Sequence, residues 1–364
     1  MKKTSNKLLS TLMLAAAIAA SGCSSSNNTP AVTPPTPGTG DGTGGGTEKP
    51  EESIYYNPVI RTSLPDPTVV RADDNMFYLY ATEDDHNVPI YQSADLVSWN
   101  KIGHVFTSET RPTFVKDGGI WAPDINKVGD KYVIYFSMSV WGGEWECGIG
   151  RAYADKPEGP FSHGEKLFTS KEVGVQNSID QFYIEDEGKK YLFWGSFHGI
   201  YGAPLTDDGL AMEGGAAGAN DKKQKIAGDF MEGTYIYKRG KYYYLIGSNG
   251  SCCEGDNSTY RLVYGRSENL FGPYVTKNGG RLLDGQYEVL LKGNAKVAGP
   301  GHNAEINTDD EGNDWIIYHG YVKGNSDNGR QTFLDQVHWT DDDWPYIDNG
   351  EPSFYHKKPV FNKK

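Results

Sequence analysis

The feature that most restricts the fold of this chain is an internal repeat, because a repeated unit usually forms one structural module. Each unit starts with a polar or charged residue, continues into an alternating strand and a tight turn, and ends in an aromatic-rich strand. Alternation on both sides of a turn that contains Gly, Asp or Asn indicates a β-hairpin. Five segments follow this plan: residues 66–82, 124–137, 180–196, 232–248 and 302–320.

Five such units predict an all-β, five-bladed β-propeller, in which sheets of about four strands surround a central channel. The alternative is a β-sandwich whose hairpins merely resemble one another. We favour the propeller, because a sandwich gives no reason for a polar residue to recur at the start of every unit. Since the innermost strand of each blade begins at the same end of the channel, the leading residues should converge there. They are Asp66, Asp124, Asp180, Glu232 and His302.

The expected convergence of four carboxyl groups and one imidazole has electrostatic consequences. Like charges that are partly removed from water repel one another, so some of these groups must have shifted pKa values or bind a cation. Crowded carboxyl groups in a cleft are candidates for acid–base chemistry. Glycoside hydrolysis needs such a pair, one carboxylic acid to protonate the leaving oxygen and one carboxylate to activate water or attack the sugar. A single Asp would be interpreted as a cap, whereas the whole set favours an active site.

Aromatic residues make up 13% of the chain, and sugars stack on aromatic rings. We expect most of the 24 Tyr residues to pack between strands. Trp121, Trp141 and Trp194 are candidates for substrate binding, and Trp121 stands out because it is three residues before Asp124. The net charge of −13 argues against nucleic acid as a partner, because phosphate binding requires clustered Lys and Arg.

The N-terminal segment has the composition of an export signal. Residues 1–7 contain three lysines and no acid, residues 8–20 are apolar, and Ser21-Gly22-Cys23 follows. This pattern predicts a signal peptide at residues 1–22, and Cys23 resembles the lipidated cysteine of bacterial lipoproteins. The alternative is an ordinary signal-peptidase site beside an incidental cysteine. Residues 23–53 are rich in Ser, Thr, Pro and Gly and predict a flexible tether, and residues 54–364 predict one propeller domain.

Five motifs occur in the order seen in glycoside hydrolase family 43, which the chain resembles over nearly all of residues 58–361. They are Pro65-Asp66-Pro67-Thr68-Val69, Trp121-Ala122-Pro123-Asp124-Ile125, Ser178-Ile179-Asp180, Met231-Glu232-Gly233 and Gly299-Pro300-Gly301-His302-Asn303. Known members are five-bladed propellers that act on arabinan, arabinoxylan and xylo-oligosaccharides with inversion at the anomeric carbon. The resemblance implies that Asp66 is the general base, Glu232 the general acid, and Asp180 the residue that positions the acid and tunes its pKa. It places Asp124 at the pocket as a non-catalytic residue, and we expect it to contact substrate.

Two further segments are similar to endo-α-1,5-L-arabinanases of this family. They are Gly250-Ser251-Cys252-Cys253 followed by Asn257-Ser258-Thr259-Tyr260, and Gly195-Ser196-Phe197 followed by Gly199-Ile200-Tyr201. In that group the histidine that matches His302 helps to hold a calcium ion, partly through waters, so the resemblance implies calcium in the central channel. A cation there would offset the crowded carboxylates. The alternative is that His302 only hydrogen-bonds a carboxylate.

Two positions depart from the family pattern and affect the expected specificity. Gln181 follows Asp180 where Pro is common, and Pro65 precedes Asp66 where several arabinanases have His. The second departure weakens an endo-acting arabinanase relative to an exo-acting arabinofuranosidase. We favour the endo-arabinanase, with an exo-α-L-arabinofuranosidase or β-xylosidase of the same family as the alternative. A non-catalytic glycan-binding propeller is the alternative from another class.

The cysteines and the N-terminal signal complete the expectations. No pair among Cys147, Cys252 and Cys253 has zinc-ligand spacing with His, and the adjacent pair could form a vicinal disulfide or remain two thiols. We expect an exported monomer that contacts the membrane only through a lipid on Cys23, at the outer membrane on its periplasmic or surface side. Its expected partner is an arabinose-containing plant polysaccharide or oligosaccharide.

Overall fold

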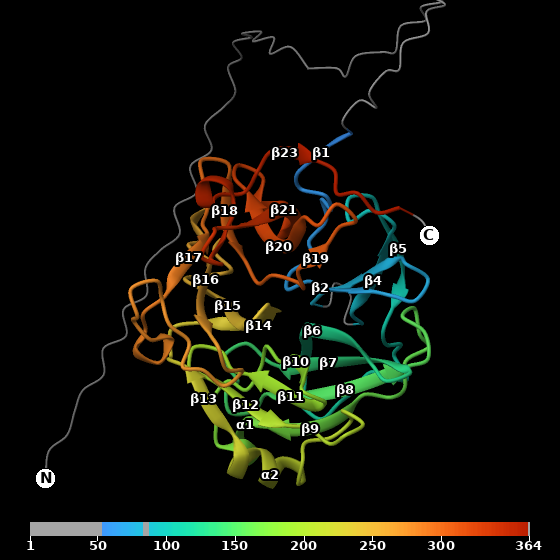
Figure 1. Ribbon diagram of the computed structural model, residues 1–364. Helices are drawn as coiled ribbons and strands as arrows, with labels where there is room; N and C mark the ends of the chain where they lie inside the picture. The colour runs from blue at the N-terminus through green and yellow to red at the C-terminus, as the bar shows by residue number, and fades with distance from the viewer. Residues whose placement is uncertain (1–52, 83–86, 363–364) are drawn as a thin grey trace, which may run out of the picture. The chain divides into compact units, whose positions relative to one another are not determined.

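Five antiparallel sheets follow one another along the chain and form the blades of a propeller, so the predicted all-β, five-bladed fold is confirmed (Figure 1). The computed structural model describes residues 53–82 and 87–362. The predicted signal peptide, the predicted lipidation site Cys23 and the predicted tether up to residue 52 lie outside the described residues. Among the helices that are described, none is long and apolar enough to cross a membrane.

Each blade is built from consecutive strands. Blade 1 contains β2 (Thr68–Arg71), β3 (Phe77–Tyr80), β4 (Pro89–Ser93) and β5 (Trp99–His104). Blade 2 contains β6 (Gly119–Val128), β7 (Lys131–Ser139), β8 (Gly148–Ala154) and β9 (Glu165–Thr169). Blade 3 contains β10 (Phe182–Asp186), β11 (Lys189–Trp194), β12 (Ile200–Pro204) and β13 (Gln224–Ala227). Blade 4 contains β14 (Glu232–Arg239), β15 (Tyr242–Asn249), β16 (Arg261–Ser267) and β17 (Glu288–Leu291). Blade 5 contains β18 (Val297–Gly301), β20 (Asp314–Val322), β21 (Gln331–Trp339) and β22 (Pro345–Tyr346), with β19 (Asn307–Thr308) beside β20.

The remaining elements are short. The two ends of the described chain pair through β1 (Ile54–Tyr56) and β23 (Tyr355–Lys357). The helices are α1 (Ser170–Val173), α2 (Gly215–Lys222), η1 (Gly255–Asn257), η2 (Leu282–Asp284), η3 (Ser326–Asn328) and η4 (Asp348–Gly350).

Aromatic side chains fill the spaces between neighbouring blades. Tyr135 of blade 2 stacks on Tyr183 of blade 3 with ring centres 5.6 Å apart. Phe182 of blade 3 meets Tyr235 of blade 4 edge to face at 5.2 Å. Burial of large apolar rings is the main favourable contribution to such packing. The high aromatic content therefore serves mainly to hold the blades together.

A ring of hydrogen bonds joins each blade to the preceding one close to the innermost strands. Five residues there have left-handed backbone conformation, with φ between 41° and 64°. Each donates its N–H to a side chain of the preceding blade. Ala122 donates to Thr82 Oγ1, Asp180 to Ser137 Oγ, Gly233 to Asp180 Oδ2, His302 to Ser248 Oγ, and Asp66 to His319 Nδ1, over 2.8 to 3.1 Å. The last bond joins blade 5 to blade 1 and closes the ring.

The ring shows that the five leading residues of the repeat do not all occupy the matching positions that the sequence had predicted. Asp66, Asp180 and His302 do occupy matching positions, but Ala122 and Gly233 are the matching residues in blades 2 and 4. Asp124 lies two residues further along its strand, and Glu232 lies one residue earlier. The pairing of β6 with β7 and of β14 with β15 is irregular next to these two residues. Such bulges insert residues and aim side chains in new directions.

Candidate active site

A cavity of about 640 Å³ opens at the end of the channel where the inner strands begin. Its volume lies within the usual range for ligand-binding pockets. Six of the eight residues that the sequence proposed for catalysis, substrate binding or metal binding line this cavity. They are Asp66, Trp121, Trp141, Asp180, Glu232 and His302.

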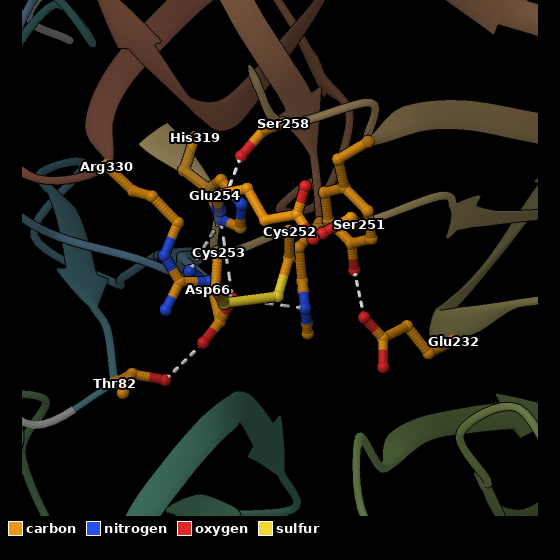
Figure 2. Close-up of a disulfide and its surroundings, with 12 residues drawn as sticks. Asp66, Thr82, Glu232, Ser251, Cys252, Cys253, Glu254, Ser258, His319 and Arg330 are labelled. Carbon is orange, nitrogen blue, oxygen red and sulfur yellow. Dashed lines mark hydrogen bonds and ion pairs between the residues drawn. A yellow bond between two sulfur atoms is a disulfide. The ribbon is translucent and has the colours of Figure 1, made fainter. Parts of the chain in front are cut away.

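Asp66 is surrounded by groups that stabilise its ionised form (Figure 2). Arg330 Nη1 donates to Asp66 Oδ1 over 3.1 Å, and Thr82 Oγ1 donates to Oδ2 over 2.5 Å. The Nδ1 atoms of His302 and His319 lie 3.3 and 3.4 Å from Oδ1. Burial alone would raise the pKa of Asp66, but the charge of Arg330 and the hydrogen bond from Thr82 outweigh it and hold the pKa well below its usual value. Asp66 therefore stays ionised to a lower pH than an ordinary Asp.

Glu232 has the opposite electrostatic environment. Its Oε2 accepts a hydrogen bond from Ser196 Oγ over 2.6 Å, and its Oε1 accepts one from the Tyr260 hydroxyl over 2.7 Å. Burial raises the pKa of Glu232, the negative charge of Asp66 adds to this effect, and the two hydrogen bonds only partly oppose it. Glu232 therefore keeps its proton to a higher pH than an ordinary Glu. The two carboxyl groups thus have pKa values pushed in opposite directions, as an acid and a base require.

Asp180 connects the site to the backbone beside Glu232. Its Oδ2 accepts the N–H of Gly233 over 3.1 Å, which fixes the peptide that follows Glu232. Its own N–H donates to Ser137 Oγ over 2.9 Å. Burial raises the pKa of Asp180, and the charges of Glu232 and Asp66 raise it further. Asp180 is therefore tied to the backbone directly after Glu232 and shares its buried, negatively charged surroundings.

The two histidines at the site play different roles. His319 is fully buried, and its Nδ1 accepts the N–H of Asp66 over 3.0 Å. Burial lowers its pKa well below the usual value, so the ring is neutral and carries its proton on Nε2. That atom is buried without a hydrogen-bond partner among the described groups. Burial also lowers the pKa of His302, whose Nδ1 faces Asp66.

The tryptophans predicted to bind substrate separate into two groups. Trp121 and Trp141 both line the cavity with ring centres 6.4 Å apart, and Trp141 is 82% exposed. Trp194 is 0% exposed and packs against Phe168 at 4.8 Å in the core between blades 2 and 3. A ring without exposed surface cannot stack on a sugar, so the prediction for Trp194 is wrong. Its strand is buried on both faces near its end.

Asp124 also lies outside the lining of the cavity, because it is buried deeper in the channel. It hydrogen-bonds Glu305 of blade 5, and its Oδ2 accepts the N–H of Tyr183 of blade 3 over 2.6 Å. Glu305 in turn accepts the N–H of Val69 and the hydroxyl of Thr68, over 2.5 and 2.8 Å. Burial raises the pKa of both carboxyls, that of Glu305 to about 7. The structure therefore places Asp124 in a buried, hydrogen-bonded carboxyl pair that joins blades across the axis, in place of the expected substrate contact.

Sequence reasoning did not single out several residues that shape the site. Arg330 comes from the loop between β20 and β21, and no motif marked it. Thr82, Ser196 and Tyr260 stand within segments that were noted, but their hydroxyl groups were not assigned to the carboxyls. Thr82 could have been found from the repeat, because it ends the unit that Asp66 begins, and the hairpin of that unit brings the two residues together.

Comparison with known proteins identifies the group to which this site belongs. Residues 55–345 match the family described as glycosyl hydrolases family 43. The chain belongs to this family. It is therefore a glycoside hydrolase, and the resemblance drawn from the five motifs is confirmed.

The relatives include enzymes whose names refer to arabinan or to its α-(1→5) linkages. The chain is 30% identical over 326 residues to the extracellular exo-α-(1→5)-L-arabinofuranosidase ArbA of Cellvibrio japonicus, covering 81% of this chain and 89% of the relative. It is 28% identical over 304 residues to the extracellular endo-α-(1→5)-L-arabinanase 1 of Bacillus subtilis, covering 81% and 91%. Among solved structures, α-L-arabinanase of Cellvibrio cellulosa in complex with arabinohexaose matches with a TM-score of 0.67 and 29% identity, over 79% of this chain and 96% of that one.

Proposed function

We propose that this family 43 enzyme hydrolyses α-L-arabinofuranosyl linkages of α-1,5-arabinan with inversion at the anomeric carbon. The observation that carries the proposal is the opposite perturbation of two carboxyl groups in one cavity, with the pKa of Asp66 lowered and that of Glu232 raised. Exposed Trp141 beside Trp121 offers a surface on which a sugar can stack. The relatives whose descriptions name arabinan linkages support the choice of substrate.

The proposed reaction is a single displacement. Asp66 removes a proton from a water molecule, and the water oxygen forms a bond to the anomeric carbon from the face opposite the leaving group. As the glycosidic C–O bond breaks, its electrons go to the leaving oxygen, which takes the proton of Glu232. Asp66 ends protonated and Glu232 ionised, and exchange with solvent restores both. Asp180 holds the Gly233 N–H and so keeps Glu232 in position.

Removal of either carboxyl tests these roles. Glu232→Ala and Asp66→Ala should each reduce kcat/KM on linear arabinan by at least about 10²-fold, the usual scale of an acid–base contribution. Normal hydrolysis by both variants would contradict the mechanism. Tight oligosaccharide binding by the parent without turnover would instead support the non-catalytic glycan-binding alternative.

Within this function we favour endo action, and an exo-α-L-arabinofuranosidase or β-xylosidase is the second candidate. The relatives include one enzyme described as exo-acting and one described as endo-acting, at similar identity. Chromatography of early products from linear arabinan separates the two. An endo enzyme releases oligosaccharides of several lengths, whereas an exo enzyme releases one short product. Faster release of xylose from aryl xylosides would favour the β-xylosidase.

We also propose a calcium ion near His302, held largely through water. Nδ1 of His302 faces Asp66, which leaves Nε2 for a metal or its water ligand. Oδ1 of the adjacent Asn303 is buried without a hydrogen-bond partner and is the type of oxygen that calcium prefers. Because the described part of the chain has no group of three His, Cys, Asp or Glu placed for a metal, water must supply further ligands. Chelation should lower Tm, added calcium should restore it, and an unchanged Tm would contradict the proposal.

Export and lipid attachment through Cys23 are proposed on the sequence pattern, together with a monomeric state. Both relatives described above are named as extracellular, which supports export. Expression of the full chain and of Cys23→Ser with a radiolabelled fatty acid tests lipidation. Label should appear only in the parent, and label in both chains, or in neither, would contradict it.

A further inference from the structure

The loop between β15 and β16 carries a feature that the proposed mechanism does not use. Cys252 and Cys253, which are adjacent in sequence, form a disulfide, so the sequence alternative of two free thiols is excluded. Both residues line the cavity that holds the three carboxyl groups. Cys252 is half-buried and Cys253 is exposed. Figure 2 draws the pair together with Asp66 and Glu232.

The position of this disulfide argues against an ordinary stabilising role. Disulfides stabilise proteins mainly by closing a long loop of the unfolded chain. Here the sequence separation is 1, so almost no chain is enclosed. The bond also joins no separate strands or blades, and it lies at the cavity rather than in the core. Its main consequence is the shape and chemistry of the cavity wall.

The loop that carries the disulfide is ordered by other contacts. The N–H groups of Thr259 and Tyr260 both donate to the carbonyl of Ser251 over 3.1 Å. The N–H of Ser251 donates to Thr259 Oγ1 over 3.0 Å. At the end of the loop, the Tyr260 hydroxyl donates to Glu232. These bonds hold the disulfide in a fixed place relative to the proposed acid.

We propose that the Cys252–Cys253 disulfide is an apolar platform for an arabinofuranosyl residue next to the one that is cleaved. The proposal rests on the proposed function. Two sulfur atoms and two Cβ atoms form a compact, polarisable surface without hydrogen-bond donors, which suits the C–H face of a sugar ring. Trp121 and Trp141 belong to blade 2 and the disulfide to blade 4, so the substrate would have apolar contacts with two walls. A disulfide between adjacent residues closes a small covalent ring through the peptide that joins them. Because this ring is rigid, little conformational entropy is lost on binding.

The test compares the parent with the double variant Cys252→Ala/Cys253→Ala on linear arabinan. We expect KM to rise about fivefold to tenfold, the scale of one lost apolar contact, with kcat within about twofold of the parent. Tm should change little because the bond encloses almost no chain. If the variant fails to fold, reduction of the folded parent with a phosphine replaces it. The phosphine gives two electrons to the disulfide, and one water molecule supplies the oxygen of the phosphine oxide and the two protons of the thiols.

A matched control lies on the same loop. Asp256 is exposed and does not line the cavity, and its Oδ2 accepts the N–H of Gly324 over 2.9 Å. Asp256→Ala should keep the parent KM if the platform acts through direct contact. An equal rise in KM in Asp256→Ala would assign the effect to loop rigidity and overturn the proposal.

The remaining outcomes separate this proposal from the proposed function. An unchanged KM in the double variant overturns the platform, while hydrolysis of arabinan by the parent leaves the proposed function standing. If the parent does not hydrolyse arabinan, the proposed function fails and the platform fails with it.

Discussion

Tyr260→Phe should move the alkaline limb of the pH–activity profile to higher pH. The Tyr260 hydroxyl donates to Glu232 Oε1 over 2.7 Å, and this bond lowers the pKa of Glu232 because it favours the ionised form. A hydrogen bond to a charged group contributes about 1.5–3 kcal/mol. One pKa unit corresponds to about 1.4 kcal/mol, so its loss should raise the pKa of Glu232 by about 1–2 units. The proposed acid then keeps its proton to higher pH.

The assay is kcat/KM on linear arabinan as a function of pH, which reports the pKa values of the free enzyme. Tyr274→Phe is the matched control, since its buried hydroxyl donates to the carbonyl of Leu270 over 2.6 Å and does not line the cavity. It should cost about 1 kcal/mol of stability and leave the limb in place. An alkaline limb in Tyr260→Phe that stays in place or moves to lower pH would refute the assignment of Glu232 as the acid.

Three further predictions concern the base, the aromatic side chains and the buried acid pair. Arg330→Met should raise the pKa of Asp66, because burial then acts with less opposition, so the acidic limb of kcat/KM should move to higher pH; an unmoved limb would argue against Asp66 as the base. Trp141→Ala should raise KM with little effect on Tm, whereas Trp194→Ala should cost about 3–5 kcal/mol of stability through a cavity in the core; equal stability losses by urea unfolding would contradict this. The pKa of Glu305 is raised from the ordinary 4.5 to about 7 in the folded state. The parent should therefore lose stability as the pH rises through the interval between these two values, where only the unfolded state releases the proton. Glu305→Gln cannot ionise, so its stability deficit relative to the parent should be smaller at about pH 8 than at about pH 5, and a constant deficit would contradict the raised pKa.

The fold was predictable because the repeat is visible as hairpins with polar leading residues, and the same repeat placed Asp66 and Asp180 at matching positions. The alignment of the units failed at Asp124 and Glu232, where irregular strand pairing adds residues that spacing alone does not reveal. Trp194 was misassigned because its position in a strand does not tell whether the outer face is covered by a neighbouring element. Arg330 and the Tyr260 hydroxyl reach the site from connecting loops, and only the folded blades bring them to Asp66 and Glu232.

Proton NMR of the first product released from linear α-1,5-arabinan tests the central claim most directly. A single displacement with Asp66 as base and Glu232 as acid inverts the anomeric carbon, so the new reducing end should appear first in the β configuration. Asp66→Ala should release almost none of this product under the same conditions. An initial α product, or equal release by Asp66→Ala, would contradict the proposed roles of the two carboxyl groups.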